Sequence, residues 1–419
     1  MLEMRKVQTG RQTNDIGFRI ALGLSLFNLV YSQESWDAEL HMHDPSTAAK
    51  LNAYCLDGTR GGFYYRPATS VASQNRWKIH YSGGGWAFDE QSLVSRSKTL
   101  LGSSSFFTPF LSKFWPPEGA GFYGLMGVND TTTADWNFVW LPYCDGTSQT
   151  SDRTDPLVVG NVTLMLRGRA LLDAHLFELE RLYNFLSTAT EVIVSGTSAG
   201  GLSARLHSSY IKSQLQVQGV KIIAAPDASW WWDSPNIKGL TPSIWLSSIT
   251  PALTLWNATL RGSGARCLEE LTPVGNASHC FTLPYMHAYS DVPFYHIQSM
   301  YDTANLGICG GLNCNLVAGQ CTEAEESFIQ TFHILMAESL LSAEAKFGDR
   351  DGHYLTSCYQ HEQSCRGFDW FGINAGTSTT LEKGFAAFYK NGGSDPESRI
   401  VDAPWPNDYS CTVGDHGAC

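Results

Sequence analysis

The chain of 419 residues contains few charged residues and no apolar run long enough to cross a membrane. Charged side chains make up only 16% of the sequence, whereas hydrophobic residues make up 43% and aromatic residues 12%. So low a charge content argues against a disordered chain or a coiled coil. Internal repeats and low-complexity tracts are also missing. We therefore expect a globular protein of one or two domains with a large buried core.

Positive charge is especially scarce. The sequence has 28 lysine and arginine residues against 40 aspartate and glutamate residues, so that its formal net charge is −12. Nucleic acids bind to surfaces rich in positive charge, and acidic polymers are less natural electrostatic partners of such a chain. We therefore expect no nucleic-acid partner.

The most extended apolar run stands close to the N-terminus. Lys6, Arg11 and Arg19 precede the apolar segment 20–31, which is too short to span a bilayer. Val30 and Ser32 fit the −3 and −1 positions of a signal-peptide cleavage site. We expect residues 1–32 to be a signal peptide and the protein to be secreted, with the cell wall as one extracellular location. An uncleaved N-terminal anchor is the alternative.

Eleven cysteines agree with an oxidising compartment, and nine of them lie after residue 260. We interpret them as disulfide partners with one cysteine left over. A Cys267–Cys280 bridge would hold the irregular segment 234–290. The spacing Cys309-x4-Cys314-x6-Cys321 also suits a metal, but the intervening glycines and asparagine favour a disulfide-stapled loop, so we expect no metal. Four sequons permit N-glycosylation: Asn129, Asn161, Asn257 and Asn276.

The stretch EVIVSGTSAGG at residues 191–201 predicts a strand, a sharp turn and a helix. Its β-branched run is typical of a buried strand, and the apolar residues from Leu202 onward recur every four residues, so a helix begins at about Ala199. The turn matches G-x-S-x-G, the pattern that presents a nucleophilic serine in front of a helix N-terminus. Ser198 is therefore the candidate nucleophile. The alternative is a glycine-rich turn with an ordinary exposed serine.

A glycine triplet precedes this turn in the chain. The segment 77–81 predicts a strand, and it leads directly into Ser82-Gly83-Gly84-Gly85-Trp86. Hydrolases with a nucleophile elbow build the second half of their oxyanion hole at this place, because glycines let backbone N–H groups approach a substrate oxygen. A flexible surface loop is the alternative, although a large ring such as Trp86 requires packing.

Strand and helix patterns alternate along the rest of the chain. This alternation predicts an α/β fold with a mostly parallel central sheet flanked by helices. Segment 234–290 has no clean sheet pattern, and we interpret it as a candidate cap inserted into a single domain spanning residues 33–419. Further strands are expected at 137–141, 221–225 and 294–300, and helices at 164–186, 323–347 and 378–390.

A serine nucleophile needs a histidine base and an acid that orients the histidine. With a nucleophile elbow, the acid and then the histidine follow the serine along the chain. Asp302 suits the acid because it follows a predicted strand, whereas Asp291 precedes that strand.

Two histidines remain as the base once those in a predicted helix and in the tail are set aside. His361 lies between Cys358 and Cys365, and disulfides there would hold its loop rigid. His353 lies in an Asp-Gly-His turn. The residues alone barely separate these two candidates.

Several short segments of the chain form a recognisable series. They are Cys55-Leu-Asp-Gly with Gly-Phe-Tyr-Tyr, Gly84-Gly85-Trp86, Pro142-Tyr-Cys-Asp-Gly, Leu166-Arg-Gly-Arg-Ala, Gly196-Thr-Ser-Ala-Gly-Gly, Asp227-Ala-Ser, Tyr301-Asp302 and Ser357-Cys-x-x-His361. Taken together, these segments resemble one family, the plant pectin acetylesterases with the Notum carboxylesterases. They follow the family's order and cover roughly residues 50 to 370.

The resemblance implies an α/β-hydrolase-like fold and a secreted carboxylester hydrolase that needs no cofactor. It selects His361 as the base over His353. The roles that it implies are nucleophile Ser198, acid Asp302, base His361, and an oxyanion hole from the backbone of Gly85, Trp86 and Ala199.

Two departures from the family pattern concern the substrate. Ala87-Phe88 stands where relatives often have a cysteine, and Ser229-Trp230-Trp231-Trp232 replaces Gly-Phe-Phe. We expect Phe88 and the three tryptophans to line the substrate pocket, or the tryptophans to form a stacking platform for sugars.

The expected substrate is an acetyl ester on a polysaccharide such as pectin, and we expect a monomer. The alternatives are removal of a longer acyl chain from a lipidated protein, a thioesterase or peptidase with the same triad, and a non-catalytic hydrolase homologue that binds glycans.

Overall fold

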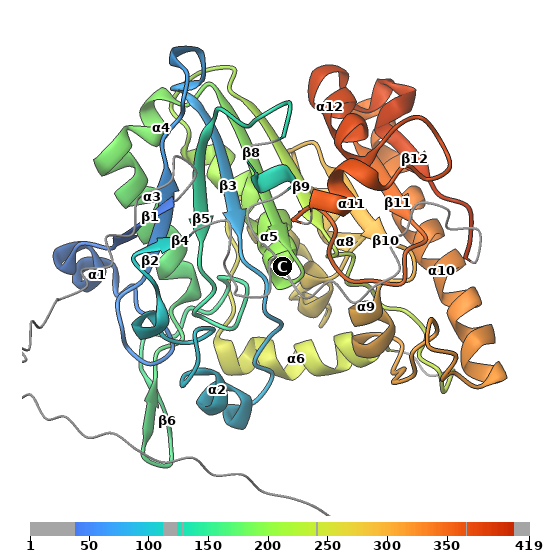
Figure 1. Ribbon diagram of the computed structural model, residues 1–419. Coiled ribbons are helices and arrows are strands. Elements are labelled where there is room, and N and C mark those ends of the chain that lie inside the picture. The colour runs from blue at the N-terminus through green and yellow to red at the C-terminus, as the bar shows by residue number, and fades with distance from the viewer. Residues whose placement is uncertain (1–37, 112–123, 128–129, 240–241, 366, 406–419) are drawn as a thin grey trace, which may run out of the picture. The chain divides into compact units, whose positions relative to one another are not determined.

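A computed structural model describes residues 38–111, 124–127, 130–239, 242–365 and 367–405 of the chain (Figure 1). The expected signal peptide, residues 1–32, lies outside this part, as do Asn129, Cys411 and Cys419.

Ten strands form one sheet in the described part of the chain. The sheet has the order β12-β11-β10-β9-β8-β3-β5-β2-β1-β4, in which all neighbours from β12 to β5 are parallel and the remaining three pairs are antiparallel. The mostly parallel sheet is therefore confirmed. The strands are β1 (Ala38–Met42), β2 (Gly62–Arg66), β3 (Arg76–Tyr81), β4 (Phe110–Leu111), β5 (Asn137–Leu141), β8 (Glu191–Thr197), β9 (Lys221–Asp227), β10 (Tyr295–Ser299), β11 (Gly352–Thr356) and β12 (Arg399–Val401).

Helices cover both faces of this sheet (Figure 1). A separate hairpin of β6 (Leu157–Val159) and β7 (Val162–Leu164) projects beyond it (Figure 1). The helices are α1 (Pro45–Leu51), α2 (Glu90–Arg96), α3 (Gly168–Tyr183), α4 (Phe185–Thr188), α5 (Ala199–Gln214), α6 (Ile244–Trp256), α7 (Ser263–Leu271), α8 (Tyr285–Tyr289), α9 (Thr303–Ile308), α10 (Glu323–Glu344), α11 (Gly367–Gly372) and α12 (Leu381–Asn391).

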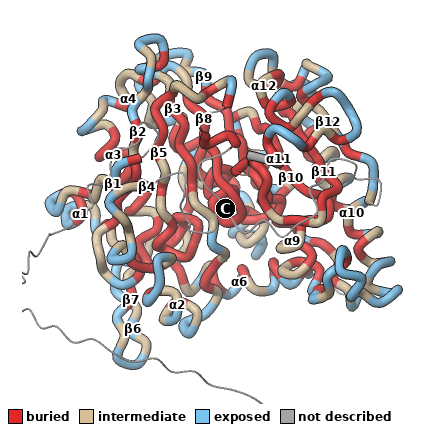
Figure 2. Tube along the Cα trace, viewed as in Figure 1, coloured by how far each residue is buried: buried red, intermediate tan, exposed pale blue. Residues whose placement is uncertain are grey.

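Alternation of side chains along β8 explains why a separate core cluster forms on each face of the sheet. Val192 and Val194 belong to one core cluster with residues of α3 and α5. Ile193, which points to the opposite face, belongs to another cluster with residues of α11 and α12. Because both faces are covered, the central strands are buried along their length (Figure 2).

The order of strands determines where loops meet. β8 and β9 lie on one side of β3, whereas β5 lies on the other, so the chain changes direction beside β3. In open α/β sheets, ligands bind at the carboxyl ends of the strands at such a switch point. The glycine loop follows β3 and the serine turn follows β8, and Tyr81 of β3 pairs with Gly196 of β8. Both loops therefore leave the sheet at the same edge.

The disulfide interpretation is confirmed for three bridges: Cys55–Cys144, Cys267–Cys280 and Cys314–Cys321. Cys358 and Cys365 are also disulfide-bonded, on the two sides of His361. Cys309 is a buried free thiol.

Candidate active site

Ser198 occupies a strained turn between β8 and α5. Its φ is 55° and its ψ is −122°, a conformation that serine adopts only when its surroundings impose it. The Ser198 N–H donates to the carbonyl oxygen of Asp227 at 3.0 Å. A Cβ on Gly200 would lie 2.1 Å from the Tyr81 oxygen, so α5 can start this close to β3 only with glycine there. The elbow expected from the sequence is present.

The glycine loop offers backbone N–H groups beside this turn. Within the described residues, the structure records no acceptor for the N–H groups of Gly85, Trp86 or Ala199. The next amide, that of Ala87, is already used, because it donates to Gly146 at 3.0 Å. Arg96 of α2 donates to the Gly84 oxygen at 2.7 Å and so ties the loop to α2.

Asp302 and His361 are brought together from distant parts of the chain. His361 Nδ1 lies 2.9 Å from each carboxylate oxygen of Asp302. Asp302 is fully buried and caps α9, where it accepts hydrogen bonds from Asn305 N at 2.9 Å and Gln298 Nε2 at 3.1 Å. The carboxylate is therefore held in place by hydrogen bonds that do not involve the imidazole. Because Nδ1 pairs with Asp302, Nε2 is the imidazole nitrogen that can bind a different partner.

This pairing has a large effect on the protonation of His361. Burial alone would lower the pKa of His361, but the charge and hydrogen bond of Asp302 raise it, with smaller contributions from Glu362 and Asp227. The resulting pKa is about 9. Asp302 thus strongly stabilises the imidazolium form, the form that a general base takes after it removes a proton.

The competing candidates contact other groups. His353 Nδ1 lies 2.6 Å from Glu344 Oε2, inside the core. Asp291 accepts a hydrogen bond from Ser209 and forms an ion pair with Lys212 at 3.1 Å. Neither contacts Ser198, Asp302 or His361 through any interaction recorded among the described residues.

Gly83 shows how near the base loop comes to the serine. A Cβ built on Gly83 would lie 3.1 Å from Ser198 Cβ and 3.1 Å from Glu362 Oε1. The residue after His361 therefore reaches the glycine loop beside Ser198. In the described part of the chain no hydrogen bond joins Ser198 to His361; such contacts are often long before substrate binds.

Asp227 is a residue of this region to which the sequence reasoning assigned no role. Its carboxylate accepts the backbone N–H groups of Gln363 at 2.6 Å and Ser364 at 2.7 Å, two and three residues after His361. Burial raises the pKa of Asp227 to about 6, although both amides favour its ionised form. Its carbonyl oxygen also holds Ser198, so one residue fixes both loops. Its position at the end of the strand beside β8 was the available signal.

The tryptophans at 230–232 do not act as one unit. All three are buried, which rules out a platform open to sugars. Trp231 lies 4.9 Å from Trp86 and 6.2 Å from His361 between ring centroids. Trp230 packs against His296, and Trp232 packs against Phe332 of α10.

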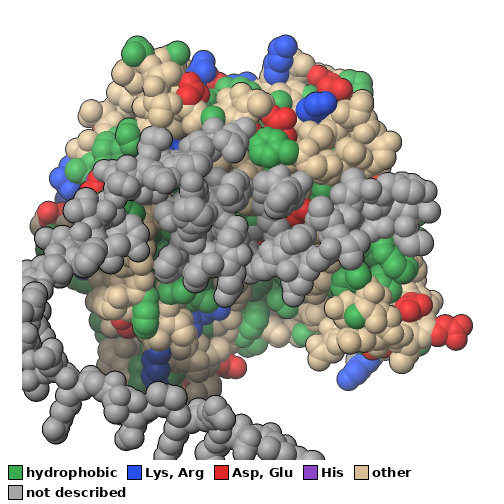
Figure 3. Space-filling view, in the orientation of Figure 1, with side chains coloured by type: hydrophobic (Ala, Val, Ile, Leu, Met, Phe, Trp, Pro, Cys, Tyr) green, Lys and Arg blue, Asp and Glu red, His purple; other side chains and the backbone are tan. Residues whose placement is uncertain are grey.

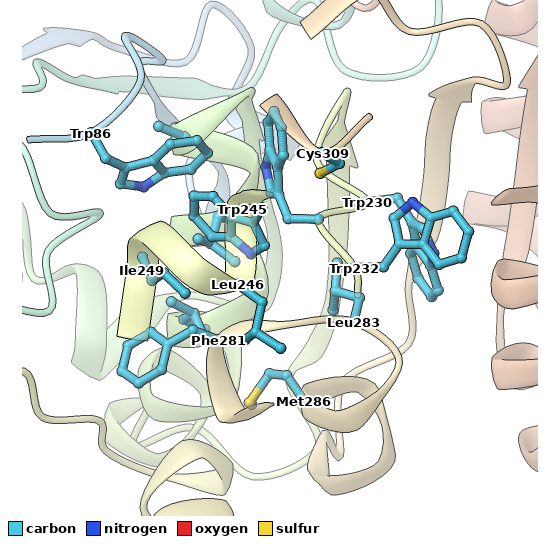
Figure 4. Close-up of a cluster of buried hydrophobic side chains, with 14 of the residues drawn as sticks. Trp86, Trp230, Trp232, Trp245, Leu246, Ile249, Phe281, Leu283, Met286 and Cys309 are labelled. Carbon is cyan, nitrogen blue, oxygen red and sulfur yellow. The ribbon is translucent and has the colours of Figure 1, made fainter. Parts of the chain in front are cut away.

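Two further aromatic rings lie beside Trp86. Trp245 of α6 is 4.3 Å from Trp86 and 5.9 Å from Phe88 between ring centroids. Figure 4 shows Trp86 next to Trp245, with Trp230 and Trp232 apart from them. Trp86, Phe88, Trp231 and Trp245 therefore form one group of rings, within which Trp231 lies beside His361.

On the face drawn in Figure 3, described side chains of both charge signs are scattered rather than gathered in a patch. Among the residues that the structure describes, none of the helices is both long and apolar enough to cross a membrane. The same residues contain no cluster of three histidine, cysteine or acidic side chains arranged to hold a metal.

A mostly parallel sheet flanked by helices, with a strained serine where the central strand meets a helix, defines an α/β-hydrolase-like protein. A sequence model described as Pectinacetylesterase matches residues 33–412. The chain belongs to the pectinacetylesterase family.

Relatives from two named groups match the chain. "Pectin acetylesterase 11" of Arabidopsis thaliana is 26% identical over 341 residues, covering 78% of this chain and 81% of the relative. "Palmitoleoyl-protein carboxylesterase NOTUM" of Schmidtea mediterranea is 26% identical, covering 74% of this chain and 56% of the relative. The human protein of that name is 23% identical, covering 82% and 64%. Carboxylester hydrolysis is the class of activity that these relatives support.

Proposed function

We propose that the protein is a secreted serine esterase in which Ser198, His361 and Asp302 form a catalytic triad. The observation that carries the proposal is the pairing of His361 Nδ1 with both oxygens of buried Asp302, in a loop that reaches Gly83 beside Ser198. This pairing fixes the tautomer in which Nε2 accepts a proton.

The reaction has two steps. His361 takes the proton of Ser198 as its Oγ attacks the ester carbonyl, and the oxyanion binds to the amides of Gly85, Trp86 and Ala199. The alcohol leaves with the proton from His361. Water, activated by the same histidine, then hydrolyses the acyl-enzyme and releases the acid.

The substrate that we propose is an O-acetyl group on a polysaccharide such as pectin, since the family and several relatives are named for pectin acetylesterase. The test is release of acetate from acetylated pectin and hydrolysis of p-nitrophenyl acetate by the wild type and by Ser198→Ala. Loss of both activities in the variant is expected. A Ser198→Ala enzyme that still hydrolyses either ester would refute the triad, and glycan binding without turnover in the wild type would favour the non-catalytic alternative.

A second candidate is removal of a longer acyl chain from a protein, as the names of the Notum relatives state for those proteins. The apolar rings Trp86, Phe88, Trp231 and Trp245 beside the site favour it, because they suit an acyl chain better than a sugar. Rates on acetyl and octanoyl esters of p-nitrophenol separate the two. A higher kcat/KM for the octanoyl ester would favour the longer chain.

Secretion, monomeric state and the cap at 234–290 belong to the same proposal. Disulfides such as Cys55–Cys144 support an oxidising compartment. The contact of Trp245 with Trp86 supports a cap over the site. We expect the mature chain to start near Gln33 by N-terminal sequencing and to elute as a monomer in size-exclusion chromatography.

A further inference from the structure

One buried serine connects the two backbone segments of the proposed oxyanion hole. Ser148 lies in the loop that follows β5 and is 1% exposed. Its hydroxyl accepts a hydrogen bond from Trp86 Nε1 at 2.8 Å and donates one to the Ala199 oxygen at 2.8 Å. Trp86 belongs to the glycine loop, and Ala199 is the first residue of α5.

The backbone of Ser148 is held as firmly as its hydroxyl. Its φ is 52° and that of Gln149 is 53°, so two consecutive non-glycine residues are left-handed. This conformation persists because the surroundings impose it: Ser148 N donates to the Tyr143 hydroxyl at 3.0 Å, and its carbonyl accepts from His207 Nε2 at 2.8 Å. Backbone strain of this kind clusters at functional sites, and Ser148 is not itself a member of the proposed triad.

A hydroxyl group is well suited to this position, because it can donate one hydrogen bond and accept another at the same time. Here it accepts from the Trp86 indole and donates to the Ala199 carbonyl, in the two segments that supply the amides of the proposed oxyanion hole. Both bonds are buried, so water does not compete with them. The same loop makes a further connection, since the Gly146 oxygen accepts the amide of Ala87.

We propose that Ser148 is a positioning residue that sets the distance between the Gly85 and Trp86 amides and the Ala199 amide. This inference rests on the proposed function. Among the described residues, no recorded hydrogen bond joins Ser148 to the side chains of Ser198, His361 or Asp302, so its role is to keep two separate chain segments in register for the oxyanion. Its loss therefore affects the transition state, in which the oxyanion exists, more than the bound substrate.

The test uses Ser148→Gly and a matched control, Ser203→Ala. Glycine removes the hydroxyl and tolerates the left-handed backbone, so the result is free of added strain. The Ser203 hydroxyl donates to the same Ala199 oxygen at 3.1 Å, but it has no bond to Trp86. Ser203→Ala thus removes a hydrogen bond to this carbonyl without breaking the bridge.

For p-nitrophenyl acetate, we expect Ser148→Gly to lower kcat by about 10- to 100-fold and to change KM by less than about threefold. The inhibition constant of an alkyl trifluoromethyl ketone, which forms a tetrahedral adduct with the serine, should rise by a similar factor. Ser203→Ala should keep kcat within about twofold of the wild type.

If Ser148→Gly does not fold, Trp86→Phe breaks the same bridge from its other end and keeps an aromatic ring. The kcat loss expected for it is the same, and circular dichroism checks its fold. Where both variants fold, their double variant should lose no more kcat than either single variant, because each removes the same connection.

Three outcomes overturn the inference. Wild-type kcat in folded Ser148→Gly overturns it alone, as does an equal loss in Ser203→Ala, which would indicate general loosening of α5. Activity in Ser198→Ala overturns the proposed function, and this inference with it.

Discussion

The pairing of His361 with Asp302 predicts an alkaline limb in the pH profile of the enzyme. The rise of the His361 pKa from 6.5 to about 9 corresponds to about 3 kcal/mol in favour of the imidazolium form, at 1.36 kcal/mol per pKa unit. In the proposed triad, only the neutral imidazole of His361 can accept the Ser198 proton. At pH 7 His361 would be neutral in about 1% of the free enzyme. We expect kcat/KM to rise about tenfold per pH unit and to level off above pH 9, since kcat/KM reports the free enzyme.

Asp302→Asn tests the cause of this limb. Without the carboxylate charge, the effect of burial on His361 remains, so the pKa falls and the limb moves to lower pH by at least one unit. The plateau should also fall by about 10³-fold or more, because the amide no longer fixes the tautomer. The assay is hydrolysis of p-nitrophenyl acetate between pH 5 and 10, with the rate of Ser198→Ala subtracted at every pH.

Glu344→Gln is the matched control. It breaks another buried histidine–carboxylate pair, that of His353, and should leave the position of the limb unchanged. A limb that stays near pH 9 in Asp302→Asn would refute the assignment of His361 and Asp302.

Stability should follow the opposite trend from activity. Because the pKa of His361 is higher in the folded than in the unfolded state, its stabilisation is complete below pH 6.5 and is lost as the pH rises through about 9. The free energy of unfolding in urea should therefore decline over this range in the wild type and decline less in Asp302→Asn.

Three other predictions follow from the same structure. Asp227→Ala leaves the amides of Gln363 and Ser364 without their buried acceptor and should destabilise the fold by about 2 kcal/mol or more in urea unfolding, with a lower kcat; unchanged stability would contradict the anchoring role. Replacing Cys55 and Cys144 by serine opens a loop that spans 89 residues and should lower the free energy of unfolding in urea by about 4 to 5 kcal/mol. Replacing Cys314 and Cys321, which are 7 residues apart, should lower it by about 2 kcal/mol. Equal losses would contradict the argument that a disulfide stabilises by restricting the unfolded chain. Asn161, exposed in the turn between β6 and β7, should carry a glycan after secretion from a eukaryotic host, so Asn161→Gln should reduce the mass on a gel unless glycosidase was applied first.

The sequence predicted the elements around the site well, because each leaves a strong local signal. The β-branched run at 192–194 and the four-residue spacing after Leu202 placed β8 and α5 almost to the residue. The glycine loop was predicted from its position after a strand. Such patterns depend on side chains near in sequence, so they survive without knowledge of the fold.

Other features depend on residues that only folding brings together. His353 and His361 were nearly equivalent in sequence, and the contact of one with Glu344 and of the other with Asp302 separates them. The sequence places Trp230, Trp231 and Trp232 together, so that they form one predicted group. In the folded protein only Trp231 packs against Trp86, whereas Trp230 packs against His296 and Trp232 against Phe332.

By itself, then, the sequence determined a mostly parallel α/β fold, a serine held at a strand-to-helix turn and a set of disulfide-forming cysteines. Tertiary structure alone decided which acid meets which histidine, that Asp227 anchors the loops of Ser198 and His361, and that Ser148 joins Trp86 to Ala199. The physical reason is range: strand and helix patterns arise from neighbours a few residues apart, whereas the Ser148–Ala199, His361–Asp302 and Asp227–Gln363 contacts join segments more than fifty residues apart in the chain.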